Sequence, residues 1–282
     1  MNAYRLAAAS ALIACALSAN VHAEVLSASA SVSITNLTFT LIDLDPLDGI
    51  APSITINDAG GSPRYELRAH ETSLGSNAQW TGQNSLNEVY ADDWRTFLAP
   101  GQAAVSSATG QSLSEMTASS VTTRASTSLD TSDTSQDFKR VAQSEALTPC
   151  CSGVGFAGFS FDLGANTAIR LQGDYSLMAQ LQPGPTAANE ASAWLGLTFG
   201  QFGLTESALA KHGGALNASQ SGLIDFTLSN DTSLTQFKYF GLSSSALAVV
   251  ESRVSPVPEP QTIALMLAGL GVVAGTRRQR RA

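Results

Sequence analysis

Residues 28–41 read ASASVSITNLTFTL, and this stretch decides the fold class. From Ala28 to Thr35 small apolar residues alternate with hydroxyl residues, and the alternation continues from Leu37 to Leu41. A repeat of two places successive side chains on opposite faces of an extended chain. The stretch therefore predicts a half-buried β-strand.

The same repeat recurs along the chain, and turn residues separate the segments that carry it. These segments span residues 158–163, 168–173, 175–181, 191–199, 223–228 and 240–250. The turn signals are Gly164-Ala165-Asn166, Gly173-Asp174, Pro183-Gly184-Pro185, Gly213-Gly214 and Ser229-Asn230-Asp231. Short strands at this spacing predict an all-β fold, an antiparallel β-sandwich of the jelly-roll kind. The sequence shows no long amphipathic helix, and leaves room for a few helical turns only near residues 87–98 and 206–211.

Residues 102–135 are unusual because 17 of these 34 positions are Ser or Thr. One interpretation is a solvated linker between two parts of the chain. The other is a set of strands with small side chains, since apolar residues still recur and β-branched Thr favours the extended state. We favour strands, and therefore expect one sandwich domain over residues 24–255.

The charge balance excludes some classes of protein. The 282 residues include 15 Lys and Arg against 23 Asp and Glu, a formal charge of -8. Without residues 1–23 and the residues after Pro258, ten basic and 22 acidic side chains remain, so the charge falls to near -12. Nucleic-acid binding needs clustered cations, and no nucleic-acid partner is expected. Three His and three Cys also make a Cys/His zinc cluster a poor interpretation.

Residues 1–23 have the composition of a secretory signal peptide. Arg5 provides a positive start, residues 6–17 form an apolar run, and Val21-His22-Ala23 offers a small-residue cleavage site before Glu24. An alternative is lipoprotein processing at Cys15, which would follow a shorter apolar run. Either interpretation predicts export.

The other end of the chain combines three features. Pro258-Glu259-Pro260 is followed by an apolar run from Ile263 to Ala274 and then by four arginines: Arg277, Arg278, Arg280 and Arg281. As a helix, the run would cover about 18 Å of a hydrocarbon core of roughly 30 Å. A basic cluster after such a run stays cytoplasmic, which leaves the rest of the chain on the exported side. The alternative is a tail anchor that is retained.

These three features, over residues 256–282, resemble the PEP-CTERM sorting signal of Gram-negative bacteria. Proteins with this signal are processed by an exosortase, a membrane enzyme similar to cysteine transpeptidases. They are directed to the cell surface or the exopolysaccharide matrix. The resemblance implies the exosortase and the export machinery as partners, with transient insertion of a precursor in the inner membrane. It implies no activity, because unrelated domains carry the same signal.

Asp43, Asp45 and Asp48 place three carboxylates beside Gly49, and calcium prefers several oxygen ligands on a tight loop. These residues are therefore candidate calcium ligands. The register differs from an EF-hand loop, because the fifth position is Leu47, and an acidic surface turn is the alternative. Residues 40–55 are also similar to an N-terminal pattern of uncharacterised PEP-CTERM proteins, which brings no activity with it.

Cys150 and Cys151 are the cysteine pair left after signal-peptide removal. An oxidising exported compartment favours a disulfide, and Pro149 and Gly153 suit a tight turn around it. Adjacent cysteines lie closer than the usual disulfide range, so their bond would close a distorted ring. The alternatives are free thiols, an intermolecular disulfide, or cysteines that take part in redox chemistry or metal binding.

No catalytic residues stand out. His70 and His212 are the histidines left after signal-peptide removal, and Gly-x-Ser-x-Gly does not occur. No spacing singles out a pair of carboxylates for glycoside hydrolysis. Trp80 and Trp94 lie in polar segments and are candidate glycan contacts, whereas Trp194 alternates with apolar residues and is predicted to lie in the core.

We therefore expect a non-enzymatic structural or adhesive protein of the cell surface, the exopolysaccharide matrix or a biofilm. The alternative is a carbohydrate-binding module, with calcium as the one cofactor considered. A third interpretation is a secreted hydrolase with an unrecognised carboxylate pair.

Overall fold

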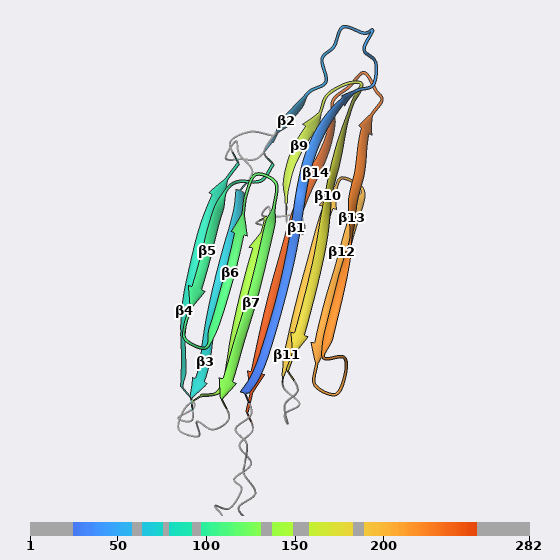
Figure 1. Cartoon of the computed structure of the whole chain (residues 1–282). Helices are drawn as coiled ribbons and strands as arrows, with labels where there is room; N and C mark the ends of the chain where they lie inside the picture. Colours follow the sequence, from blue (N-terminus) through green and yellow to red (C-terminus); the bar gives the residue numbers. More distant parts are fainter. Residues whose placement is uncertain are drawn as a thin grey trace, which may run out of the picture. The chain divides into compact units, whose positions relative to one another are not determined.

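The alternation that begins in residues 28–41 extends along the chain, whose described residues form fourteen β-strands in two antiparallel sheets (Figure 1). The structure is a computed structural model that describes residues 25–57, 64–75, 79–91, 97–130, 137–148, 158–182 and 189–252. All of these residues belong to one unit, Val25–Ser252. The expected all-β, antiparallel fold is confirmed, with more strands than the eight of a jelly roll. No helix long and apolar enough to span a membrane occurs in the described part of the chain.

Each sheet has a strand order that mixes neighbours in sequence with distant partners. The six-stranded sheet runs in the order β13 (Asn217–Asn230), β10 (Thr167–Leu181), β1 (Val25–Asp43), β7 (Val121–Asp130), β6 (Gly110–Met116) and β5 (Gly101–Ser106). The eight-stranded sheet runs in the order β12 (Phe202–Lys211), β11 (Glu190–Phe199), β14 (Gln236–Glu251), β8 (Asp137–Leu147), β3 (Arg64–Gly75) and β4 (Trp80–Tyr90). Its last two strands are β9 (Phe159–Leu163), which pairs with β14, and β2 (Ile54–Ile56), which pairs with β9.

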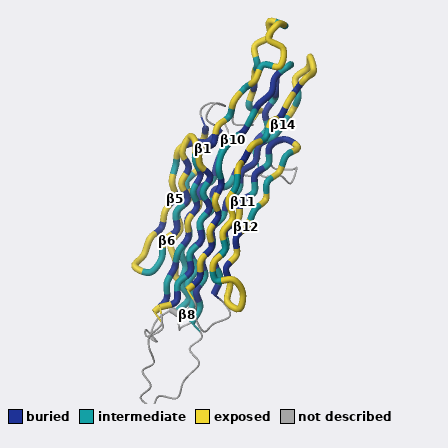
Figure 2. Tube along the Cα trace, turned by 45° about the vertical axis from the view of Figure 1, so that its right-hand side comes forward, coloured by how far each residue is buried: buried dark blue, intermediate teal, exposed yellow. Residues whose placement is uncertain are grey.

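Buried and exposed residues alternate along the long strands (Figure 2). The inward residues of β1 are Leu26, Ala28, Ala30, Val32 and Ile34, all of which are buried. Their outward neighbours are serines. Alternation of apolar and hydroxyl residues thus gives one face to the core and one to solvent, as the sequence predicts.

Aromatic side chains fill one region of the core between the sheets. Phe39 of β1 stacks on Phe97, with ring centroids 4.0 Å apart, and meets Phe240 of β14 edge to face at 5.7 Å. The hydroxyl of buried Tyr65 donates a hydrogen bond to the backbone oxygen of Phe97. Burial raises the pKa of Tyr65 well above its ordinary value, so this hydroxyl stays protonated and remains a donor.

The Ser/Thr-rich segment contains β5, β6 and β7, so up to Asp130 it is a set of strands joined by turns at residues 107–109 and 117–120. Its inward serines connect the two sheets. Ser112 of β6 donates to the backbone oxygen of Gln143 in β8, and Ser114 donates to that of Glu145 at 2.7 Å. Small hydroxyl side chains let the sheets approach closely enough for these bonds, which large apolar residues would prevent.

Three local expectations from sequence were wrong. Residues 206–211 are not helical, because they form the second half of β12. Residues 87–90 are not helical either, because they form the end of β4, and residues 92–96 lie outside the described residues. Gly173-Asp174 is not a turn but lies within β10, opposite a bulge in β1 between Thr35 and Thr38. A Cβ at Gly173 would meet the side chain of Leu37 at 3.0 Å, so glycine here makes room for the bulged strand.

Three connections meet at one end of the sandwich (Figure 1). Asn166, in the β9–β10 turn, donates its backbone N–H to Thr232 in the β13–β14 connection at 3.1 Å. It also accepts from the backbone N–H of Leu44, where the β1–β2 connection begins, at 2.8 Å. Strand β1 begins and β14 ends at the opposite end of the sandwich.

Candidate functional site

Trp194 lies on the outward side of β11 and is 40% exposed. The inward residues of β11 are Ala191, Ala193, Leu195, Leu197 and Phe199, all buried. Trp194 belongs to the opposite, polar phase of the strand with Ser192 and Gly196. The expectation that Trp194 lies in the core was therefore wrong, and the indole is available at the surface.

The indole of Trp194 lies over Gly196, two residues along the same strand. A Cβ placed on Gly196 would come 2.5 Å from Cη2 and 2.9 Å from Cζ2 of the indole, closer than real side chains allow. Only glycine at this position lets the ring lie along the sheet instead of standing away from it. The result is an aromatic surface held against a β-sheet.

Hydroxyl side chains surround this aromatic surface. In the strand register Trp194 pairs with Ser245 of β14 on one side and with Ser207 of β12 on the other. Gly196 pairs in the same way with Ser243 and Thr205. Residues that pair across neighbouring strands share one face, so all four hydroxyl residues flank the indole.

Charged residues continue the same row across the sheet. Ser245 pairs with Glu145 of β8, which pairs with Arg68 of β3. The guanidinium Nη1 of Arg68 lies 3.9 Å from Oε2 of Glu145, and Gln143 donates to Oε1 of Glu145 at 2.7 Å. We call the outward row Arg68, Glu145, Ser245, Trp194 and Ser207 the Trp194 face.

A second group of charges adjoins the Trp194 face and holds Arg68 in place. Arg68 also pairs with Glu66, and Glu66 pairs with Arg64 at 3.0 Å. Arg64 lies 2.5 Å from Glu88 of the edge strand β4. Because Arg64 and Glu88 are more than a third exposed, these pairs orient the side chains more than they stabilise the fold.

Trp80, a candidate glycan contact from sequence, is 54% exposed at the start of β4. The strand register places it on the same outward side as Trp194. The two indoles are separated by about 20 Å along the strands and about 20 Å across them. The structure therefore puts both on one side of the sandwich without bringing them together.

The three candidate calcium ligands build the β1–β2 connection. Asp43 Oδ1 accepts from the backbone N–H of Asp45 at 3.0 Å, and Asp45 Oδ1 accepts from that of Leu47 at 3.2 Å. Asp48 accepts from the backbone N–H of Ile50 at 2.7 Å and from the side-chain amide of Asn166 at 2.6 Å. Each carboxylate thus accepts a hydrogen bond from the backbone N–H two residues further along the chain, which stabilises a turn.

The bonds to Asp48 lower its pKa below the ordinary value, with the amide of Asn166 as the larger cause and the N–H of Ile50 as the next. Among the described residues no group of three His, Cys, Asp or Glu side chains is placed to hold a metal ion. The structure thus places Asp43, Asp45 and Asp48 in one connection, where each accepts hydrogen bonds from protein N–H groups.

His70 and His212 are far from each other in the fold. The Nδ1 atom of His70, in β3, contacts Oδ1 of Asn84 in β4. His212 lies in the turn after β12, where its backbone N–H donates to Asn189. Trp94, Cys150, Cys151, the signal peptide 1–23 and residues 253–282 lie outside the described residues.

Residues 256–281 match the family model of the PEP-CTERM protein-sorting motif. The matched range contains Pro258, Glu259 and Pro260, the apolar run and the four terminal arginines. The resemblance stated from sequence is confirmed. The chain is an exported protein that an exosortase sorts through a membrane-anchored intermediate. Neither a curated protein nor a solved structure matches the chain.

Proposed function

We propose that this exported protein is a non-catalytic adhesive that binds polysaccharide of the cell surface or extracellular matrix through the Trp194 face. The observation that carries the proposal is the exposed indole lying over Gly196. A pyranose ring presents C–H groups on its faces and hydroxyls at its rim. An aromatic surface bordered by hydroxyl and charged side chains complements both parts of such a ring.

The shape of the site favours a chain over a single sugar. The Trp194 face is part of an open sheet, and the partly exposed Arg68 lies in the same row, three strands away from β11. Arg68 and Glu145 present donors and acceptors for hydroxyl groups, and Trp80 adds a second indole on the same side. A long polymer could contact several of these groups at once, so modest individual contacts would sum.

The net negative charge of the protein favours neutral over anionic polysaccharides. The chain between the two processed segments has a formal charge near -12, with ten basic and 22 acidic side chains. Such a surface repels polyanions unless cations bridge the two. We therefore propose a neutral polysaccharide as the ligand.

The test is binding of the purified exported protein to neutral polysaccharides, such as cellulose, chitin and starch, and to the exopolysaccharide of the producing cells. Affinity electrophoresis should show retardation by at least one of them. Trp194→Ala should weaken binding by roughly tenfold or more, because the aromatic surface is lost. Leu223→Ala is the control, since Leu223 is also exposed, at 77%, but lies on β13 of the other sheet.

Three results would overturn the proposal. If Trp194→Ala bound polysaccharide as well as the natural protein, the Trp194 face would not be the binding site. If the protein bound none of the polysaccharides, a purely structural role would remain. Hydrolysis of a bound glycan, lost on replacing one Asp or Glu, would make the protein an enzyme. Repeating the assay with a chelator tests calcium dependence, which Asp48→Asn should remove if the β1–β2 connection holds the ion.

A further inference from the structure

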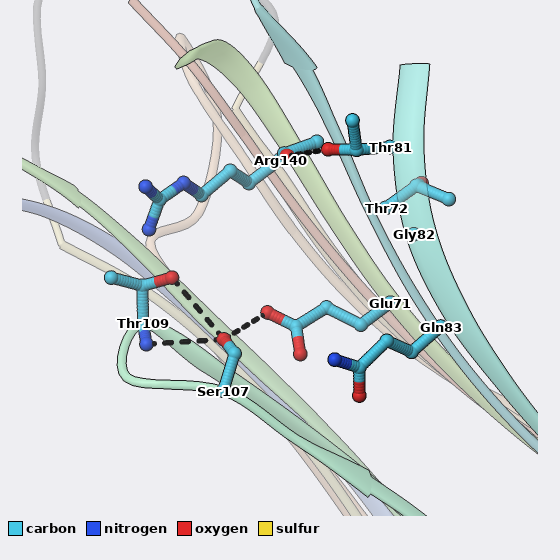
Figure 3. A pocket seen from close by; sticks show the side chains of 9 residues that line it. Glu71, Thr72, Thr81, Gly82, Gln83, Ser107, Thr109 and Arg140 are labelled. Carbon is cyan, nitrogen blue, oxygen red and sulfur yellow. Dashed lines mark hydrogen bonds between the residues drawn. The ribbon is translucent and has the colours of Figure 1, made fainter. Parts of the chain in front are cut away.

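A polar pocket lies between the two sheets, on the inward side of β3 and β4. Its volume is about 340 Å³, and its lining includes Glu71, Thr81, Gln83, Ser107, Thr109 and Arg140. Figure 3 shows the carboxylate of Glu71 and the guanidinium of Arg140 reaching into the same space from neighbouring strands. The pocket is distinct from the Trp194 face, because Glu71 and Arg140 point inward while Arg68 and Glu145 of the same strands point outward.

The carboxylate of Glu71 is fixed by the turn between β5 and β6 in the opposite sheet. The hydroxyl of Ser107 accepts from the backbone N–H groups of Thr109 at 3.2 Å and Gly110 at 3.1 Å. Its single proton is then directed to Oε1 of Glu71, 2.5 Å away.

Gly110 is part of the same arrangement. A Cβ at this position would come 2.5 Å from Oε1 of Glu71, so a larger residue would displace the carboxylate. On the other wall, Nη1 of Arg140 donates to the backbone oxygen of Ser128 in β7 at 3.1 Å. Both charged side chains are thus tied to the opposite sheet, and the pocket is preformed.

We propose that this pocket binds one neutral monosaccharide unit, either free or at the end of a glycan. Glu71 offers acceptors, Arg140 offers donors, and Gln83 and Thr109 offer both. Sugar hydroxyls also donate and accept, so one sugar can satisfy these groups together. The hydroxyl and amide groups of Thr81, Gln83 and Thr109 fit a neutral ligand, and a volume near the lower limit of ~300–1,000 Å³ fits a small one.

A zwitterion such as an amino acid is the competing ligand, because it could pair with both charges. The hydroxyl and amide groups of Thr81, Gln83 and Thr109 favour the sugar, since an amino acid without hydroxyls would leave them to water. None of the residues lining the described pocket is aromatic, so recognition there rests on hydrogen bonds. This inference does not depend on the Trp194 face.

The experiment is saturation-transfer NMR and calorimetry of the purified exported protein with glucose, galactose, mannose and N-acetylglucosamine, and with glycine and glutamate. We expect saturable binding of at least one sugar. Glu71→Ala should weaken it roughly tenfold or more, because a charge-assisted hydrogen bond is lost. Glu115→Gln, on the outward side of β6, is the control with the same change of charge.

The outcomes separate this proposal from the previous one. The variants are compared in a Trp194→Ala background, which removes any sugar bound at the Trp194 face; monosaccharide binding to the pocket should persist there, whatever the substitution does to polysaccharide binding. Gln83→Ala is a second variant in case Glu71→Ala unfolds, and it too should weaken sugar binding. The proposal is overturned if no sugar binds, if only glycine or glutamate binds, or if sugar binding survives both pocket variants in folded protein.

Discussion

Asn230, at the end of β13, is a fully buried polar residue that joins two turns. Its amide nitrogen donates to the backbone oxygens of Leu163 at 2.9 Å, Gly164 at 2.7 Å and Leu234 at 2.7 Å. Its side-chain oxygen accepts from the backbone N–H and the hydroxyl of Thr232. Such a side chain stabilises the fold only while all its bonds are made.

We predict that Asn230→Asp lowers the free energy of unfolding by about 3–5 kcal/mol at neutral pH. The new carboxylate would be buried and would face three backbone oxygens with no donor for them. Burial would raise the pKa of this carboxyl, so the loss should shrink as pH falls through the raised value. Urea unfolding measures the effect, and Asn217→Asp, at the exposed start of β13, should change stability by less than about 0.5 kcal/mol.

Asp48 should make the stability of the protein depend on pH in the opposite direction. The amide of Asn166 and the N–H of Ile50 lower its pKa below the reference value of 3.8 in the folded protein. The stabilisation is therefore complete above pH 3.8 and is lost as pH falls through the lower folded value.

Asp48→Asn should accordingly melt at a lower temperature than the natural protein at pH 7. The difference should stay constant down to about pH 5 and shrink in stronger acid. Thermal melts by circular dichroism across this range provide the measurement, with Asp231→Asn on the β13–β14 connection as the control. A difference that grows toward low pH would contradict the assigned direction.

At a single bulge in β1 the inward-facing positions change from even-numbered to odd-numbered residues, while the same face of the strand stays toward the core. Before the bulge the inward residues are even-numbered and end at Ile34, whereas after it they are odd-numbered and begin at Leu37. Asn36, with φ of 56°, is the added residue. The bulge also releases β1 from β7, because the backbone N–H of Leu37 donates to Ser119 in the turn before β7.

Substitutions of Asn36 should separate backbone conformation from side-chain contacts. Asn36→Val should destabilise the protein by about 1–2 kcal/mol, because β-branched residues are disfavoured at positive φ. Asn36→Gly should be close to neutral, although it too loses the bond to Asp174. Urea midpoints measure both, and equal stability of the two variants would show that the positive φ carries no strain.

Most strands could be predicted because the alternation of apolar and polar residues is a local pattern. The segments that were predicted wrongly owe their conformation to strands distant in the sequence. A Gly173-Asp174 dipeptide looks like a turn until its neighbour β1 is known to bulge opposite it. Residues 206–211 suggested a helical turn, because only pairing with β11 reveals their extended state. The β5–β6 turn that fixes Glu71 could not be foreseen, because Ser107 and Glu71 are 36 residues apart.

The residues around Trp194 in the sequence indicate that its side chain faces outward, although we predicted a core position. Its neighbours two positions away are Ser192 and Gly196, whereas Ala193 and Leu195 belong to the apolar phase of the strand. Assigning alternate residues of this strand to its two faces would have placed the indole on the solvent side. That the ring lies over Gly196 with hydroxyls on both sides could not be read from the chain, because the cross-strand register decides it.

In the unit Val25–Ser252, the β1–β2, β9–β10 and β13–β14 connections lie far from the two ends of the described chain, whereas the β12–β13 connection lies near them (Figure 1). The 19 residues of β1 cover about 60 Å. Strand β1 begins and strand β14 ends at one end, and the β1–β2 connection lies at the other (Figure 1). Residues before Val25 and after Ser252 are therefore joined to the sandwich at the same end, and their removal breaks no strand pairing of the described residues.

This arrangement predicts that sorting and folding are separable. Replacing Pro258, Glu259 and Pro260 by alanines should leave the strands intact, because the described strands end at Glu251, but it should prevent processing of the matched motif. In cells that contain the exosortase, intact mass should show the natural protein without residues 1–23 and without the arginine-rich end. The variant should keep that end and stay in the membrane fraction.

Replacing the four arginines Arg277, Arg278, Arg280 and Arg281 by glutamine tests the other half of the signal, because a basic cluster holds the end of the chain on the cytoplasmic side. This variant should also escape normal sorting, while urea unfolding of its exported unit matches the natural protein. A natural protein that keeps its arginines in exosortase-containing cells would contradict the sorting assignment. Loss of the β-sheet signal in either variant would show instead that the tail takes part in folding.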